Sequence, residues 1–309
     1  MTNCWHVLGA GAIGSLFAAS LHRAGIATTV LCRSGRQYER LRDKGIDISI
    51  DRNGITETIT FPVSDNAGAD AISHLLVTTK AYDVLTAVSE VAHRLSTHSH
   101  IILLVNGLGF MDDLQSSFPG FQFTVGTTTE GAYALDPEQG THHFCHAGNG
   151  LTQLGQTNTE KPPPWFDDWA GIDLPCIWET DIEQSLWRKL AVNCAINPLC
   201  ALHGCKNGEL SERPELAKRV HQLCDEIALV SVAAGFQETA NNIHCWVNTV
   251  ITETCDNRSS MLQDVLAGRR TENEYISGYF LKLAKQYGVT TPYSKAAYEG
   301  ILQSDRMNN

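Results

Sequence analysis

The sequence predicts an α/β protein in which an N-terminal, doubly wound parallel sheet precedes a C-terminal all-helical domain. Strand and helix signals alternate over the first 110 residues, and two continuous apolar runs, 75–79 and 101–105, are typical of strands buried on both faces. From residue 181 onward the apolar spacing is almost wholly helical. We therefore expect two domains, residues 1–180 and residues 181–309.

Local sequence patterns predict the individual helices and strands. Gly25 is expected to end a helix, Asn53-Gly54 is a strong hairpin signal, and the proline run at 162–164 indicates a surface loop. The expected elements, in chain order, are strands at 5–8 and 28–32 around a helix at 12–24, a hairpin at 46–61, strands at 75–79 and 101–105 around a helix at 81–95, and a strand-like, turn-rich stretch at 121–154.

Composition excludes several classes of protein. The formal net charge of -11 argues against a nucleic-acid partner. No apolar run approaches the ~20 residues that a membrane-spanning helix needs, and the N-terminus lacks the basic lead-in of a signal peptide. The 10 cysteines are scattered and include no C-x-x-C motif, as expected of reduced thiols in a cytoplasmic protein.

A glycine motif, Gly9-Ala10-Gly11-Ala12-Ile13-Gly14, directly follows the first strand and opens the first helix. Gly9 permits the tight turn, Gly11 lets a pyrophosphate approach the backbone, and Gly14 allows the helix to pack closely on the strand. The helix N-terminus presents free N–H groups to the phosphates. A glycine-rich turn without a ligand is the alternative, but the β-α-β context favours dinucleotide binding.

The end of the second strand indicates which dinucleotide binds. An NAD site places Asp or Glu there, whereas this chain has Arg33 and Ser34. A cation and a hydroxyl suit a 2′-phosphate, so NADP(H) is expected. The alternative is that Arg33 only pairs with a surface carboxylate.

Two further polar residues follow buried strands, where open α/β sheets bind ligands. Lys80 follows the strand at 75–79, and Asn106 follows the strand at 101–105, with Gly107 and Gly109 leaving room for a ligand. We expect both residues to contact the cofactor, although a lysine after a strand is often a solvated loop residue.

The segment 187–199 carries the strongest signal of chemistry. Lys189, Asn193 and Asn197 have helical i, i+4, i+8 spacing on an otherwise apolar helix. An ammonium and two amides on a buried helix are costly unless they face partners or a polar cavity. Pro198 should kink or end this helix. The alternative is a lysine reaching the surface with two amides capping turns, but three polar residues on one stripe favour a site.

Two later segments complete the candidates. Ser260 lies in the segment 259–264, and Glu272 and Glu274 lie in 271–276. The two glutamates cannot share a helix face, since they are about 200° apart. One of them should therefore face inward.

Together these motifs resemble the ketopantoate reductase (2-dehydropantoate 2-reductase) family over nearly the whole chain. The resemblance implies a Rossmann-type domain and a helical domain like that of 6-phosphogluconate dehydrogenase. It implies that Lys189 is the catalytic lysine, that Glu272 assists it, and that Asn106 touches both cofactor and substrate. It further implies substrate binding by Asn193, Asn197 and Ser260. The implied cofactor-binding set is Gly9, Ala10, Gly11, Ala12, Ile13, Gly14, Arg33, Lys80, Asn106 and Glu272.

The implied function is reduction of 2-dehydropantoate to pantoate with NADPH, with Lys189 as general acid. Asn273 and Ser277 depart from the residues usual in the family and bear on substrate identity. Two alternatives stay open: an NADPH-dependent reductase of another 2-keto acid, and a non-catalytic NADPH-sensing protein. The expected partner is a small keto acid, and the chain is expected to be a monomer or a homodimer.

A histidine-rich stretch, His142-His143-Phe144-Cys145-His146, raises the question of a metal site. On a strand it offers at most two ligands per face, and no second pair has the spacing to complete a set. We therefore expect no metal here and interpret the stretch as a surface strand with incidental histidines.

Overall fold

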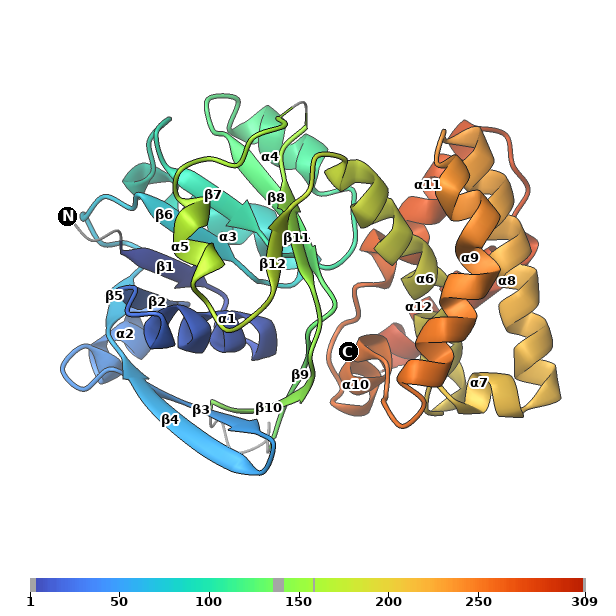
Figure 1. Ribbon diagram of the computed structural model, residues 1–309, viewed down its shortest axis with the longest axis horizontal. Coiled ribbons are helices and arrows are strands. Elements are labelled where there is room, and N and C mark those ends of the chain that lie inside the picture. Colours follow the sequence, from blue (N-terminus) through green and yellow to red (C-terminus); the bar gives the residue numbers. More distant parts are fainter. Residues whose placement is uncertain (1–3, 136–141, 158, 308–309) are drawn as a thin grey trace. The chain divides into compact units, whose positions relative to one another are not determined.

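The computed structural model describes residues 4–135, 142–157 and 159–307, and the chain divides into two compact units (Figure 1). The sheet unit contains the residues up to Val105 together with Phe110–Ile182. The helical unit contains Asn106–Gly109 together with the residues from Glu183 onward. The short segment Asn106–Gly109 thus packs with the helices, although it follows a strand of the sheet in the chain.

The main sheet of the sheet unit has eight strands in the order β12-β11-β8-β7-β6-β1-β2-β5. The six strands from β8 to β5 pair in parallel, which confirms the predicted doubly wound sheet, whereas β11 is antiparallel to β8. The strands are β1 (Trp5–Leu8), β2 (Thr28–Cys32), β5 (Val63–Asp65), β6 (His74–Val77), β7 (His100–Leu103), β8 (Phe123–Thr128), β11 (Thr152–Gly155) and β12 (Cys176–Trp178).

The hairpin predicted around Asn53-Gly54 is present, and both turn residues have the positive φ, 53° and 79°, that such a turn requires. Its strands belong to a second sheet, ordered β4-β3-β10-β9, in which β3 pairs with β10 in parallel. The strands of this second sheet are β3 (Ile46–Arg52), β4 (Ile55–Phe61), β9 (Gly131–Ala134) and β10 (His143–Gly148).

Helix α1 (Ala12–Arg23) lies between the two sheets, since it contacts β1 and β2 as well as β3, β9 and β10 (Figure 1). All eight of its residues from Gly14 to Leu21 are buried for this reason. The remaining helices of the sheet unit are α2 (Gly35–Leu41), the short η1 (Ala81–Asp83), α3 (Val84–Val91), η2 (Ala92–Arg94), α4 (Met111–Ser117) and α5 (Phe166–Ala170).

The helical unit is built on a buried core that includes Trp187, Phe280 and Ile227. Its longest helices, α6, α8 and α9, all contribute apolar residues to this core. Helices α8 and α9 form a hairpin whose turn contains Gly235 at φ 88°. Among the described residues, every helix is too short or too polar to span a bilayer. The helices are α6 (Ile182–His203), α7 (Glu209–Glu212), α8 (Pro214–Ala233), α9 (Gln237–Glu253), α10 (Ser260–Leu266), η4 (Asn273–Tyr275), α11 (Ser277–Gln286) and α12 (Pro292–Met307).

Candidate functional site

The glycine loop between β1 and α1 is held tightly by two of its glycines. Gly9 has φ 102°, and a Cβ there would lie 2.8 Å from the Thr79 backbone nitrogen. A Cβ on Gly14 would lie 2.2 Å from the Gly9 carbonyl oxygen, whereas a Cβ on Gly11 would meet nothing within 4 Å. The loop therefore requires Gly9 and Gly14 for its own packing and leaves open space at Gly11.

That open space suits a phosphate group. Gly11 is the N-cap of α1 and provides no side-chain acceptor for the first-turn amides. Close by, the Thr79 side-chain oxygen is buried without a hydrogen-bond partner among the described residues. Free amide donors at a helix N-terminus, next to room for a ligand, fit a dinucleotide pyrophosphate.

Arg33 follows β2 and lines a cavity of about 320 Å³ together with Ser34, Asp65 and Asn66. Its side chain is 88% exposed and lies 3.7 Å from the Asp83 carboxylate, so the pairing with a surface carboxylate is loose. The sequence reasoning missed Asp65, because this acid follows β5 and becomes a neighbour of Arg33 only through the pairing of β2 with β5. The guanidinium and the Ser34 hydroxyl are the donors suited to a 2′-phosphate.

Lys80 lies at the start of η1, after β6, and is partly exposed. It follows Thr78, whose hydroxyl donates to the Gly9 carbonyl oxygen at 2.7 Å. Strands β1 and β6 are neighbours and run in parallel. Lys80, after β6, and the glycine loop, after β1, therefore lie at the same edge of the sheet.

Asn106 belongs to the helical unit. The Leu108 amide donates to the Tyr275 carbonyl oxygen at 2.8 Å. Gly107, with φ 84°, approaches that same carbonyl so closely that a Cβ would lie 2.6 Å from it. The segment is therefore fixed against η4, and the Asn193 side-chain amide donates to the Asn106 side-chain oxygen at 3.2 Å.

Helix α6 carries the predicted polar stripe. Asn197 is buried, while Lys189 and Asn193 are partly buried. Pro198 was expected to kink or end the helix, and it does not end it, because α6 continues to His203. Apolar residues on both sides of the proline are buried in the core and hold the helix together despite the lost backbone donor.

Lys189 and Glu272 interact electrostatically. Burial lowers the pKa of Lys189 to about 8, while the Glu272 carboxylate opposes that decrease. Glu272 is buried at the start of η4, and Glu274 is exposed and hydrogen-bonded to the Tyr298 hydroxyl. One glutamate thus faces inward and the other outward, as the spacing predicts.

Ser260 is the first residue of α10 and its side chain is exposed. Its buried neighbour Ser259 is the helix N-cap, and the Ser259 hydroxyl oxygen accepts a hydrogen bond from the Leu262 amide at 3.2 Å. Ser259 therefore caps the N-terminus of α10, whereas the Ser260 hydroxyl is accessible.

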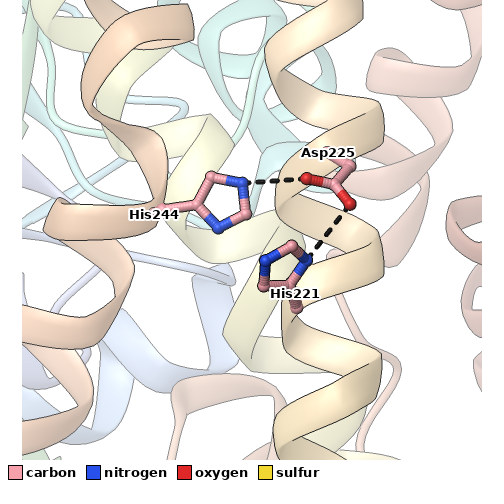
Figure 2. Close-up of side chains that lie close together, drawn as sticks. All are labelled: His221, Asp225 and His244. Atoms are coloured by element: carbon pink, nitrogen blue, oxygen red, sulfur yellow. Dashed lines mark hydrogen bonds and ion pairs between the residues drawn. The ribbon is translucent and has the colours of Figure 1, made fainter.

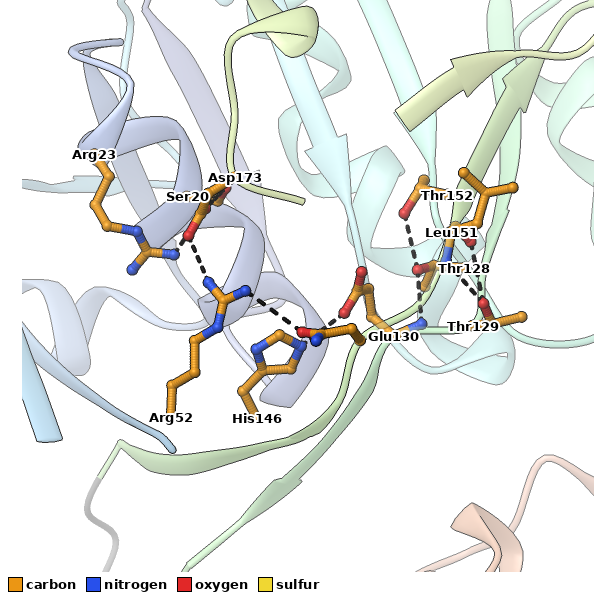
Figure 3. Close-up of polar contacts among 11 residues, drawn as sticks. Ser20, Arg23, Arg52, Thr128, Thr129, Glu130, His146, Leu151, Thr152 and Asp173 are labelled. Carbon is orange, nitrogen blue, oxygen red and sulfur yellow. Dashed lines mark hydrogen bonds and ion pairs between the residues drawn. The ribbon is translucent and has the colours of Figure 1, made fainter. Parts of the chain in front are cut away.

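The histidine-rich strand differs from the expectation of incidental surface histidines. His146 is buried, and its Nε2 lies 2.7 Å from the Glu130 carboxylate (Figure 3). His143, the first residue of β10, pairs with Asp51 at 2.8 Å. Glu130, which follows β8, is therefore a partner of β10 and joins the two sheets. In the described part of the chain, none of these histidines belongs to a cluster that could share a metal ion.

The other contacts in Figure 3 hold the same region together. Asp173 pairs with Arg23 at 3.0 Å and with Arg52 at 2.6 Å. The Thr152 hydroxyl donates to the Thr128 hydroxyl at 2.9 Å between β11 and β8. These contacts serve the packing of the sheet unit, and no predicted site residue takes part in them.

Comparison with known proteins gives matches to both parts of the chain. The family described as "Ketopantoate reductase PanE/ApbA" matches residues 5–159, and its C-terminal family matches residues 181–303. The 2-dehydropantoate 2-reductases of Vibrio cholerae and Shigella flexneri are 35% and 33% identical over 301 residues. These matches cover 96% and 97% of this chain, and 95% and 94% of the relatives.

A solved structure of D-mandelate dehydrogenase with NADH and anilino(oxo)acetate has a TM-score of 0.88 to this chain. It covers 99% of both chains at 22% sequence identity. At that identity the likeness concerns the fold.

Proposed function

Because this chain belongs to the ketopantoate reductase family, we propose that it reduces 2-dehydropantoate to pantoate with NADPH, using Lys189 as the proton donor. The observation that carries the proposal is the polar stripe of α6. On it, a lysine with a pKa lowered to about 8 shares one helix face with two amides. The nearby Glu272 completes a set suited to acid catalysis on a polar substrate.

Reduction of a ketone adds a hydride to the carbon and requires a proton on the oxygen. The nicotinamide of NADPH supplies the hydride when bound. Lys189 Nζ donates the proton and is left as a neutral amine, which takes a new proton from water. A pKa of about 8 suits this task, because the lysine is mostly protonated at neutral pH and yet releases its proton more readily than an exposed lysine.

Glu272 acts on the protonation of Lys189 through its charge. Its carboxylate favours the ammonium form of Lys189 and so limits the decrease in pKa that burial causes. Glu272 therefore maintains the supply of protonated lysine at the pH of the reaction.

The amides bind the substrate without adding charge. Asn193 and Asn197 offer donors and acceptors to the hydroxyl and carboxylate groups of the keto acid, and the exposed Ser260 hydroxyl adds one more. Asn106, held by Asn193 at 3.2 Å, is assigned to contact both substrate and cofactor.

We assign the cofactor to residues of the glycine loop, Gly9–Gly14, together with Arg33 and Lys80. The open space at Gly11 and the uncapped N-terminus of α1 support this assignment for the pyrophosphate. The exposed guanidinium of Arg33 supports NADPH over NADH. Dinucleotide binding is thus assigned to residues 1–180, and catalysis to residues 181–309.

All ten cysteines are free thiols, which supports a cytoplasmic location. We propose that the enzyme acts there as a monomer or a homodimer, and light scattering of the purified chain distinguishes the two.

The replacement Lys189→Ala tests the assignment of the proton donor. We expect kcat to fall by about 10²–10⁴, the range for loss of a general acid, while NADPH still binds, as followed by its fluorescence. Lys218→Ala, which changes an exposed lysine on α8, is the control and should retain wild-type activity. Unchanged turnover in Lys189→Ala would remove this lysine from the mechanism.

A further inference from the structure

A cluster of potential metal ligands lies on the outer face of the helical unit. His221 and Asp225 belong to α8, and His244 belongs to α9. Figure 2 shows both imidazoles pointing at the carboxylate of Asp225. All three residues are exposed, and none of them takes part in the function proposed above.

The distances are close to those of a metal site. The Nδ1 of His221 lies 3.1 Å from one carboxylate oxygen, and the Nε2 of His244 lies 3.0 Å from the other. Ligand atoms around a tetrahedral zinc ion, with bonds near 2.0–2.1 Å, are roughly 3.3 Å apart. One ligand atom from each residue lies within 4.8 Å of the others, so small rotations of exposed side chains bring all three around one ion.

The helices explain why these residues meet. His221 and Asp225 are four residues apart, so they lie on the same face of α8. The hairpin turn at Gly235 brings α9 back along α8 and sets His244 opposite Asp225, with the two imidazole centroids 4.6 Å apart. The ligands thus come from two rigid helices rather than from loops.

We propose that His221, Asp225 and His244 bind a divalent transition-metal ion such as Zn²⁺, which ties α8 to α9. Two imidazoles and one carboxylate are the ligand types that such ions prefer, and water completes the coordination. Each imidazole nitrogen that now faces Asp225 would bind the ion through its lone pair, with its proton moved to the other ring nitrogen. No change in net protonation of a neutral histidine is needed.

Titration calorimetry with Zn²⁺ alone tests the proposal on the full chain. We expect the wild type to bind one equivalent more than Asp225→Asn, or to bind that equivalent at least about tenfold more tightly. His244→Ala should behave like Asp225→Asn. Because all three residues are exposed, these variants should fold, and far-UV circular dichroism checks that they do.

Two matched control variants test whether Zn²⁺ binds to other exposed side chains instead. His98→Ala removes an exposed histidine of the sheet unit, and Cys245→Ser removes the exposed thiol next to His244. Both should bind Zn²⁺ as the wild type does. Thermal unfolding gives a second readout: a hundredfold excess of Zn²⁺ over its Kd should raise the Tm of the wild type by roughly 5 °C and that of Asp225→Asn by at most about half as much.

Two results would overturn the proposal. The first is the absence of saturable Zn²⁺ binding to the wild type, which would leave the cluster as a hydrogen-bonded His–Asp–His group. The second is equal stoichiometry and affinity in the wild type, Asp225→Asn and His244→Ala, which would assign the ion to other residues.

Discussion

Replacing Glu272 with glutamine changes the charge next to Lys189 while keeping the size of the side chain. Burial lowers the pKa of this lysine to about 8, and Glu272 opposes the decrease. Without the carboxylate, the pKa of Lys189 should fall further, because nothing then compensates the cost of burying the ammonium. A general acid must be protonated to act. As the pH rises, the activity of Glu272→Gln should therefore decline at a lower pH than that of the wild type.

The size of the effect follows from the fraction of protonated lysine. With a pKa of about 8, about half of the lysine is protonated at pH 8 and nearly all of it at pH 6. A decrease of about one unit, the low end of the effect of an adjacent opposite charge, leaves about one-tenth protonated at pH 8 and about nine-tenths at pH 6. The ratio of kcat at pH 6 to kcat at pH 8 should therefore rise from about 2 to about 10.

The assay is the pH profile of kcat at saturating NADPH and 2-dehydropantoate. The ratio is independent of any uniform loss that follows from missing contacts of Glu272. Glu274→Gln, two residues away and exposed, is the matched control and should keep the wild-type profile. A Glu272→Gln profile that stays in place, or moves to higher pH, would refute the electrostatic account of this pair.

Three further substitutions test the remaining parts of the account. Arg33→Ala should raise the KM for NADPH about 10–100-fold and leave that for NADH unchanged, since charged hydrogen bonds to a phosphate contribute about 1.5–3 kcal/mol. Gly14→Ala should lower the free energy of unfolding by about 1–3 kcal/mol in urea titrations, because the added Cβ would lie 2.2 Å from the Gly9 carbonyl oxygen. Glu130→Ala should cost about 1–3 kcal/mol in the same titrations, because it leaves His146 buried without its partner.

Each substitution has a control that changes a similar residue in a different setting. Arg36→Ala removes a neighbouring exposed arginine and should not alter the preference for NADPH. Gly11→Ala meets open space, so it should keep wild-type stability but weaken NADPH binding. Asp51→Ala breaks the partly exposed pair with His143 and should lower the free energy of unfolding less than Glu130→Ala does. Equal effects within any pair would contradict the structural reason given for it.

Much of the fold was predictable because its signals are local. The strand at 28–32 and the hairpin around Asn53-Gly54 follow from patterns within a few residues, and the parallel pairing of the apolar strands follows from their alternation with helices along the chain. The second sheet was not predictable, because β3 pairs with β10, about ninety residues later, and no local pattern specifies that pairing. The burial of His146 depends on that sheet and was missed for the same reason.

The candidate site, like the fold, was predictable only where its signals are local. Periodicity alone put Lys189, Asn193 and Asn197 on one helix face, and the about 200° between Glu272 and Glu274 indicated that only one of these acids faces inward. The contact of Asn106–Gly109 with Tyr275 was not predictable, since it joins a loop after the sheet to a turn of the helical unit. Likewise, Asp65 reaches the Arg33 cavity only through strand pairing.

The central claim is tested most directly by following NADPH absorbance at 340 nm with purified protein and 2-dehydropantoate. NADH and other 2-keto acids, 2-ketobutyrate and 2-ketoisovalerate, serve as parallel substrates. Fast oxidation only with NADPH and 2-dehydropantoate, lost in Lys189→Ala, is the predicted result. Oxidation only with another keto acid would contradict the substrate assignment, and tight NADPH binding without turnover on any of them would favour a sensing protein.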